Sequence, residues 1–366
     1  MAIDLEPAVA GDLLPEARPD SGPTALGWLG RALFVAAVAA VSLYYVFHFE
    51  PSHSDVLANG VILGVGALSL NVLIGYAGQI SLGQQAFVGI GAFTSAYVIS
   101  QSHQSFYAGL AAAAAVGIAQ AVALGLVALR VRGLYFALVT LVWGFVAENC
   151  IFRLEGFTGG GAGQDAPRPG GFTTDRAYLG LCVIVLAVIL LIDWRLVATK
   201  AGRAMQALRE SPQVAANYGV NVRAYTLLAF AVAGFYAGVA GALFGSRRLN
   251  VVSEDFTFAQ VALPYLIVTI VGGLRRRGGI VVFALLFVLA GDWLPDLASS
   301  LGVTYIEQRA GLFIQAFTGV LAILTLIFQP DGLGTLTAPI GKWLKGGPFR
   351  RGGGGGGGAE GIDVRP

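Results

Sequence analysis

Long apolar segments separated by short polar ones run along most of the chain. A helix that rises 1.5 Å per residue needs about 20 apolar residues to cross the roughly 30 Å hydrocarbon core of a bilayer. Ten segments approach this length, and we predict that each forms a membrane-spanning helix. They are residues 26–49, 56–75, 84–101, 107–129, 133–152, 178–194, 225–246, 260–274, 278–298 and 310–328.

Two of these segments depart from the simple pattern. Segment 84–101 follows a polar, glycine-rich stretch, and segment 260–274 is short and contains Pro264. Because proline removes a main-chain donor and interrupts helices, we treat both as candidates for broken or re-entrant helices.

Composition and charge support a membrane protein. Hydrophobic residues make up 56% of the chain and charged residues 12%, whereas soluble domains are about 25% charged. In a ten-span topology that starts in the cytoplasm, most of the 23 Lys and Arg residues fall on the cytoplasmic side. We therefore predict an all-α, polytopic helical bundle of about ten spans, with both termini and the loop around 195–223 in the cytoplasm.

The two ends of the chain differ from the apolar region between them. Residues 1–25 are rich in acids and prolines, and residues 337–366 are rich in glycine, so neither segment buries enough apolar surface to fold. We predict disordered cytoplasmic tails at these places and a transmembrane domain over residues 26–336.

Glycines four residues apart recur within the apolar segments. A pair of small residues at this spacing shares one helix face and lets two backbones approach closely. The pattern predicts a compact bundle of many helices. The pairs are Gly60 with Gly64, Gly234 with Gly238, and Gly241 with Gly245.

The sequence lacks the motifs of several enzyme classes. It contains no GxxxxGK[ST] phosphate-binding loop, so we expect no ATP hydrolysis by this chain. It contains no HExxH or CxxC motif, and Cys150 and Cys182 lie in apolar segments, where inert packing thiols are expected. We predict a protein that is not an enzyme, with no catalytic residue, metal or cofactor of its own and no nucleic-acid partner.

A polar stretch over residues 71–92 interrupts the apolar pattern. Unsatisfied polar groups and irregular backbone are tolerated at membrane depth where they are buried in protein or line an aqueous cavity. We therefore interpret the stretch as the break between the second and third spans; a plain cytoplasmic turn with tight packing is the alternative. The residues that we predict for a substrate pathway are Asn71, Tyr76, Gln79, Ser81, Gln84, Gln85 and, on the fifth span, Glu148.

Intramembrane acids are costly and often functional. Glu148 lies near the outer end of its span and Asp292 lies within segment 278–298. The alternative for both is that they reach the interface or pair with a polar neighbour. The long outer loop 153–177 has the composition of a flexible linker, although a loop of this length can also contact an outer partner.

The loop over residues 198–223 carries a second informative pattern. Ala201, Ala204, Met205 and Leu208 recur at i, i+3, i+4 and i+7, which predicts one apolar stripe on a short helix. Ser211 and Pro212 then have the types of an N-cap and a first helical residue, and Gly219 that of a helix stop. Two short amphipathic helices are predicted, which either lie on the lipid surface or dock onto a cytoplasmic partner.

Four stretches together resemble one family. They are "NVLIGYAGQISLGQQAFVGIGAFTSAY" at 71–97, "LRVRGLYFALVTLVWGFVAE" at 129–148, "KAGRAMQALRESPQVAANYGVNVRAYTLLAFAVAGFYAGVAGALFG" at 200–245, and "FQPDGLGTL" at 328–336. The chain resembles the LivM-type permease subunit of branched-chain amino acid ABC importers from about residue 55 to 336.

The resemblance implies a permease subunit in a bacterial inner membrane. It implies a second permease subunit, two cytoplasmic ATP-binding subunits that bind and hydrolyse ATP, a periplasmic substrate-binding protein, and contact with membrane lipid. In this scheme the two short helices form the coupling element in the ATP-binding subunit and rock the spans between inward-open and outward-open states. The coupling residues that it implies are Lys200, Gly202, Arg203, Arg209, Glu210 and Gly219.

Two departures from the family pattern leave the cargo open. Arg275, Arg276 and Arg277 stand where the family usually has small residues, and Gln84 and Gln85 stand where it commonly has His-Ala. Our first hypothesis for the cargo is a branched-chain or related small amino acid, and our second is urea or a short amide. A channel or ion-coupled carrier is the alternative from another class, but it needs paired intramembrane acids that the sequence does not present.

Overall fold

The computed structural model describes residues 51–131 and 133–300. These residues belong to one compact unit, Leu43–Ala338, and they are almost entirely helical. The predicted spans 26–49 and 310–328 and the predicted tails 1–25 and 337–366 lie outside the described residues.

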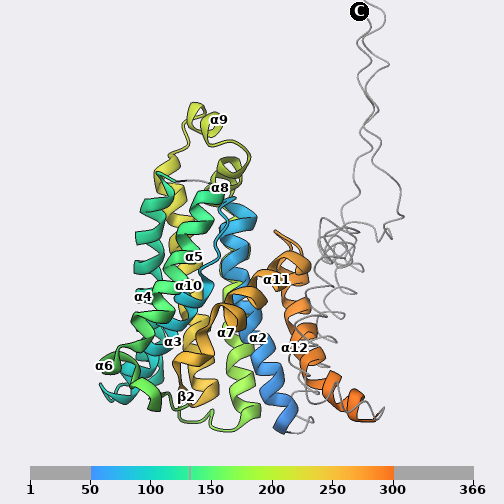
Figure 1. Cartoon of the computed structure of the whole chain (residues 1–366). Coiled ribbons are helices and arrows are strands. Elements are labelled where there is room, and N and C mark those ends of the chain that lie inside the picture. The colour runs from blue at the N-terminus through green and yellow to red at the C-terminus, as the bar shows by residue number, and fades with distance from the viewer. Residues whose placement is uncertain (1–50, 132, 301–366) are drawn as a thin grey trace, which may run out of the picture. The chain divides into compact units, whose positions relative to one another are not determined.

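The elements follow one another as a series of helices with two very short strands (Figure 1). The helices are α2 (Pro51–Leu70), α3 (Gln84–Ser100), α4 (Phe106–Ala128), α5 (Leu134–Asn149), α6 (Glu155–Thr158), α7 (Asp175–Ala198), α8 (Lys200–Glu210), α9 (Pro212–Asn217), α10 (Val222–Arg248), α11 (Leu263–Gly272) and α12 (Arg277–Ser300). The π-helices are η1 (Asn71–Tyr76) and η5 (Phe258–Ala262), and the 3-10 helices are η2 (Ile151–Arg153), η3 (Gly160–Ala162) and η4 (Ser253–Phe256). The strands are β1 (Gln164–Asp165) and β2 (Asn250–Val251).

Every predicted span within the described residues coincides with a helix. Five helices are long and apolar enough to cross a membrane. Two further apolar helices, Phe258–Gly272 and Arg277–Gly291, are shorter. The five long helices are His53–Tyr76, Phe106–Ala128, Leu134–Arg153, Asp175–Ala198 and Val222–Arg248.

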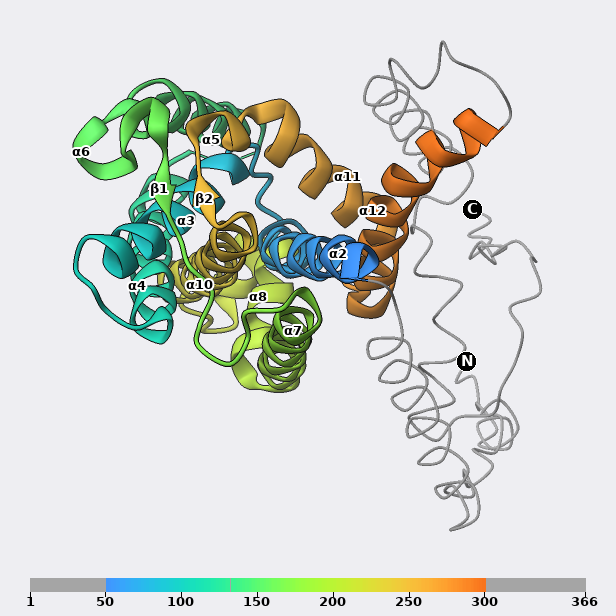
Figure 2. The ribbon, with the colours of Figure 1, turned by 90° about the horizontal axis from the view of Figure 1, so that it is seen from below.

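Helices α2 and α10 form the centre of the bundle. α10 packs against α3, α4 and α2, and α2 also packs against α7, α11 and α12 (Figure 2). The most apolar window of α2 is 83% buried, whereas that of α5 or α7 is only 28% buried. The outer helices α4, α5 and α7 therefore turn broad apolar faces away from the core.

The glycine pairs mark places where helices touch. A Cβ on Gly234 would lie 2.2 Å from the carbonyl oxygen of Gly117, so α10 and α4 meet backbone to backbone. A Cβ on Gly241 would lie 2.0 Å from the carbonyl oxygen of Val88 on α3, and one on Gly60 would lie 3.0 Å from a methyl group of Leu285 on α12. The small-residue pattern thus predicted close helix packing correctly.

The two ends of the bundle differ. The short helices α8 and α9 project at one end, the α8–α9 end, and the β1–β2 ribbon and α6 lie at the other, the ribbon end (Figure 1). The chain breaks between α2 and α3: α2 continues into the π-helix η1, residues 77–83 are irregular, and α3 begins at Gln84. This supports a break in the helix pattern at the polar stretch.

The segment 153–177 is ordered at the ribbon end, which corrects its interpretation as a flexible linker. β1 pairs antiparallel with β2, with Gln164 opposite Val251. Arg168 donates to Asp175 at 2.7 Å and to the carbonyl oxygen of Ser246 at 3.4 Å, while its guanidinium stacks on the ring of Tyr178. These contacts fix the loop in a way that its glycine-rich composition did not indicate.

Candidate functional site

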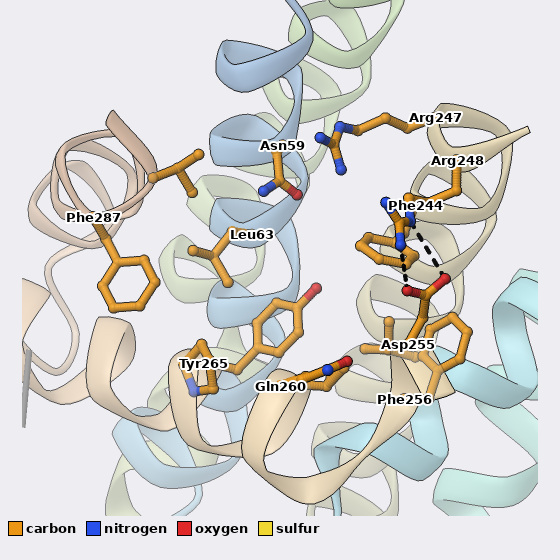
Figure 3. Close-up of a pocket in the computed structure, with 14 residues that line it drawn as sticks. Asn59, Leu63, Phe244, Arg247, Arg248, Asp255, Phe256, Gln260, Tyr265 and Phe287 are labelled. Carbon is orange, nitrogen blue, oxygen red and sulfur yellow. Dashed lines mark hydrogen bonds and ion pairs between the residues drawn. The ribbon is translucent and has the colours of Figure 1, made fainter. Parts of the chain in front are cut away.

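A cavity of about 340 Å³ lies among α2, α10, α11, α12 and the η4–η5 segment, towards the ribbon end (Figure 3). Its volume falls in the range of small-molecule sites, roughly 300–1,000 Å³. It is built where the C-terminal end of α10 meets the segment that leads into α11. None of the residues predicted for the substrate pathway lines it.

One side of the cavity is charged. Arg248, at the end of α10, donates from Nη2 to Oδ1 of Asp255 at 2.6 Å and from Nε to Oδ2 at 3.3 Å. Arg247 donates from Nη2 to Oδ2 of Asp55 at 2.6 Å and from Nε to the Asp55 carbonyl oxygen at 3.3 Å. One wall of the cavity therefore carries partly buried ion pairs, with charges of both signs.

The opposite side is apolar. Figure 3 shows Leu63 and Phe287 on the side away from the two guanidinium groups, with the ring of Tyr265 near the floor. The amides of Asn59 and Gln260 lie between these two sides (Figure 3). The cavity can thus accept a small molecule that has a polar, charged part and an apolar part.

Two predicted pathway residues, one on each side of the break, each use one amide atom to hydrogen-bond within the protein. Asn71 is fully buried, and its Oδ1 accepts a 2.7 Å hydrogen bond from the main-chain N–H of Arg275. Gln84 donates from Nε2 to Ser69 Oγ at 3.1 Å and to the Gly66 carbonyl oxygen at 3.3 Å. These residues tie the break to α2 and to the turn before α12.

Other pathway residues have buried polar atoms without partners. Within the described part of the chain, Oγ of Ser81, Oε1 of Gln79 and both amide atoms of Gln85 have no hydrogen-bond partner. The Gln85 amide packs closely against α5, since a Cβ on Gly144 would be 2.2 Å from its Nε2. Unsatisfied polar atoms at this depth are costly.

Tyr76 belongs to a polar cluster that sequence reasoning missed. Its hydroxyl donates to Oδ2 of Asp193 at 2.8 Å, and Arg277 donates from Nε to that same Oδ2 and to the Tyr76 hydroxyl oxygen at 3.3 Å. Asp193 is 0% exposed, and its carbonyl oxygen also accepts from Nη2 of Arg277 at 3.2 Å. The available signal was an acidic residue inside an apolar segment, which flags a charge that needs a partner.

Glu148 lies elsewhere, at the ribbon end of α5. Its Oε2 accepts a 3.2 Å hydrogen bond from the main-chain N–H of Phe258, the first residue of η5. With Arg153 and Glu254 it lines a second cavity, of about 390 Å³. The structure therefore does not gather the predicted pathway residues into one site. Asp292, the other acid singled out in the sequence, lies in α12.

The α8–α9 loop has the predicted two-helix form. Ala204, Met205 and Leu208 are buried, so the apolar stripe of α8 faces the bundle. Ser211 caps α9 by accepting a 3.3 Å hydrogen bond from the N–H of Val214, and Gly219 follows the helix with φ of 81°. The N-cap and the stop are both confirmed.

The predicted coupling residues divide into two groups. Arg209 donates from Nη1 to the Gly75 carbonyl oxygen at 2.8 Å, and a Cβ on Gly202 would lie 2.4 Å from the Leu196 carbonyl oxygen, so these two face the bundle. The side chains of Lys200, Arg203 and Glu210 are exposed.

Two exposed apolar side chains of this loop were not predicted as site residues. Tyr218 is 85% exposed and Val214 is 53% exposed, on or just after α9. Large apolar groups that project from a short loop are typical of contact surfaces.

Several long apolar helices that bury polar groups in one bundle are typical of a multi-pass membrane protein. The family model "Branched-chain amino acid transport system / permease component" matches residues 52–328. The chain belongs to this family.

Curated relatives agree with the family match. The high-affinity branched-chain amino acid transport system permease protein LivM of Escherichia coli is 28% identical over 337 residues, which cover 84% of this chain and 76% of the relative. LivM of Salmonella typhimurium is 29% identical over 337 residues, which again cover 84% of this chain and 76% of the relative. The probable permease protein LivH of Methanocaldococcus jannaschii is 26% identical over 220 residues, 58% of this chain and 61% of the relative. No solved structure matches the chain significantly.

Proposed function

We propose that this chain is a transmembrane subunit of an ATP-driven importer that moves branched-chain amino acids across a bacterial inner membrane. The observation that carries the proposal is the family match over residues 52–328, which includes both the helix break and the α8–α9 loop. In this role the chain has no catalytic residue, and ATP is bound and hydrolysed by partner subunits. We further propose ten spans and cytoplasmic termini, with the α8–α9 end in the cytoplasm.

The α8–α9 loop supports a coupling role. Its buried stripe holds α8 on the bundle, while the exposed side chains of Lys200, Arg203, Glu210 and Tyr218 are free to meet an ATP-binding subunit. A push on α8 reaches the break directly through the hydrogen bond from Arg209 to Gly75. Closure of two ATP-binding subunits would then displace η1 and the irregular segment after it.

Two other surfaces suit the remaining partners. The exposed apolar faces of α4, α5 and α7 are suited to lipid and to a second permease subunit, for which the LivH-type relative is a precedent within the family. The ordered loop at the ribbon end, held by Arg168, offers a fixed surface to a periplasmic substrate-binding protein.

The experiment that tests the function is uptake in cells that depend on this chain. Deletion should abolish ATP-dependent uptake of labelled leucine, and the full chain supplied in trans should restore it. Copurification with the tagged chain should recover two ATP-binding subunits and a second permease. Leucine uptake that continues after deletion, or transport by the chain alone in liposomes without ATP, contradicts the proposal. Uptake of urea in place of leucine would assign the cargo to another class.

A further inference from the structure

We propose that the cavity at the ribbon end of α10 is a binding site for the amino acid in transit and that it holds the cargo as a zwitterion. The proposal rests on the proposed function for the cargo class, but its evidence is the cavity itself. Free amino acids carry a carboxylate and an ammonium group a few bonds apart, so a complementary site needs a cation and an anion close together beside an apolar wall.

The charged wall meets the first requirement. Asp255 is bound to Arg248 through both carboxylate oxygens, and its side chain is 12% exposed, against 48% for that of Arg248. A carboxylate offers about four acceptor positions and a guanidinium five donors, so this pair has capacity left after its two mutual bonds. The ammonium group of the cargo would bind Asp255, and its carboxylate would bind the guanidinium groups of Arg248 and Arg247.

The geometry of the arginines favours this assignment. Arg248 contacts Asp255 through Nε and Nη2, which leaves Nη1 on the other edge of the guanidinium. Arg247 comes from the preceding position and is anchored by Asp55, with its side chain 14% exposed. Charge-assisted hydrogen bonds to an arginine fork are among the strongest that a carboxylate can form.

The remaining walls fit the side chain of a branched-chain amino acid. Leu63 and Phe287 lie on the side away from the charges (Figure 3), and Val288 and Tyr265 also line the cavity. A side chain with its own charge would lose its hydration against these groups, which is costly. Urea has neither charges for the paired wall nor an apolar part for the opposite one. The site therefore selects a small zwitterion with an aliphatic side chain.

The test is protection of a cysteine in the cavity. In a Cys150→Ser background, Gln260→Cys places an exposed thiol at the cavity, and Gly161→Cys places a matched control thiol in the second cavity at the same end. The full chain is assayed in membranes that also contain its partner subunits, with a maleimide as the probe and millimolar L-leucine as the ligand. We expect leucine to slow labelling at position 260 at least about threefold and to leave position 161 unchanged.

Leucine analogues that carry only one of its two charged groups test whether the cavity binds a zwitterion. Isocaproate lacks the ammonium group and isoamylamine lacks the carboxylate, so each should protect position 260 about tenfold less well than leucine. Asp255→Asn should weaken leucine protection by a similar factor while protection by isocaproate changes little. Equal protection by leucine and both analogues would overturn the proposal, as would protection by urea or none by leucine.

Uptake measurements separate this proposal from the proposed function. If cells import leucine through this chain but leucine fails to protect position 260, the binding site is wrong and the function stands. If leucine protects position 260 in the charge-dependent way but deletion leaves leucine uptake unchanged, the site stands and the function is wrong. If Asp255→Asn does not fold, the comparison of leucine with its analogues on the Gln260→Cys chain still decides.

Discussion

Arg209 on α8 donates a 2.8 Å hydrogen bond from Nη1 to the main-chain carbonyl oxygen of Gly75, in the π-helix that ends α2. The two residues are 134 positions apart in sequence. π-Helical turns are rare and frequently occur at functional sites. The contact joins the projecting α8–α9 loop to the place where the membrane helix pattern breaks.

Removing this contact should weaken coupling. Arg209→Ala deletes a charge-assisted hydrogen bond worth about 1.5–3 kcal/mol, and we expect leucine uptake to fall about tenfold while ATP hydrolysis continues. The measurement is the ratio of leucine transported to ATP hydrolysed by the reconstituted transporter.

Arg203→Glu is the matched comparison on the same helix. Arg203 is exposed and contacts only the nearby Ala198 carbonyl oxygen among the described hydrogen bonds. Its reversal should lower recovery of the ATP-binding subunits in copurification, whereas Arg209→Ala should leave recovery unchanged. Normal transport ratios for Arg209→Ala would contradict a coupling role for the contact with Gly75.

Gly78 should not tolerate a side chain. Its φ of 68° lies in the left-handed region, where a non-glycine residue costs about 1–2 kcal/mol, and its Cβ would lie 2.8 Å from Cγ of Arg209. Gly78→Leu should therefore lower the thermal unfolding midpoint in detergent and reduce uptake. Gly180→Leu on α7 is the control, because a Cβ there meets nothing within 4 Å. Equal midpoints for the two variants would show that Gly78 is not at a close approach.

The helices could be predicted from the sequence because each one has a pattern of apolar residues or end signals within its own segment. The apolar segments 107–129 and 225–246 became α4 and α10, and Ser211, Pro212 and Gly219 marked the bounds of α9. These features depend on residues within one or two helical turns of each other. The sequence also indicated the break near residues 71–92, since polar residues and glycines interrupted an apolar pattern there.

The sites depend on contacts between distant segments, which one sequence does not reveal. Asp193 and Arg277 are 84 positions apart, and the charged wall of the cavity joins Arg247 to Asp55 across 192 positions. Asp193 lies next to the end of the predicted span 178–194, and nothing in its local sequence indicates Arg277 as its partner. The sequence also did not show that the loop 153–177 is ordered. Its strand β1 pairs with β2, a distant segment that the glycine-rich composition of the loop does not indicate.

Removing one partner of the ion pair between Asp193 and Arg277 should destabilise the fold, whereas replacing both partners by apolar residues should not. Asp193→Leu leaves the Arg277 guanidinium without its buried counter-charge, and loss of one partner of such a pair costs about 3–5 kcal/mol. Replacing both by apolar residues of similar size is often neutral or better. Asp193→Leu should thus lower the unfolding midpoint strongly, and the double variant Asp193→Leu, Arg277→Met should recover most of the loss.

Transport by the double variant shows what the pair does. If the pair only holds α7, η1 and α12 together, the double variant should regain leucine uptake along with its stability. If the pair opens and closes during transport, stability should return without uptake. Single-variant losses that simply add in the double variant would mean that the two side chains do not interact.

Gln84 and Gln85, neighbours at the start of α3, should respond in opposite ways to the same substitution. Gln84→Leu removes hydrogen bonds to Ser69 and to the Gly66 carbonyl oxygen, so it should reduce the free energy of unfolding by about 1–2 kcal/mol. Gln85→Leu removes a buried amide whose two polar atoms have no partner among the described residues, so it should be neutral or stabilising.

Because Gln85→Leu is not expected to harm the fold, uptake by this variant tests the predicted substrate pathway directly. A well-folded Gln85→Leu chain that imports leucine poorly would mean that the amide is kept for the cargo or for water along its path. Normal uptake with raised stability would remove Gln85 from the pathway and favour a break that serves as a hinge. Labelling of cysteines placed at Gln79 and Ser81, with and without leucine, then distinguishes a wet pathway, in which leucine changes the labelling, from a dry hinge, in which it does not.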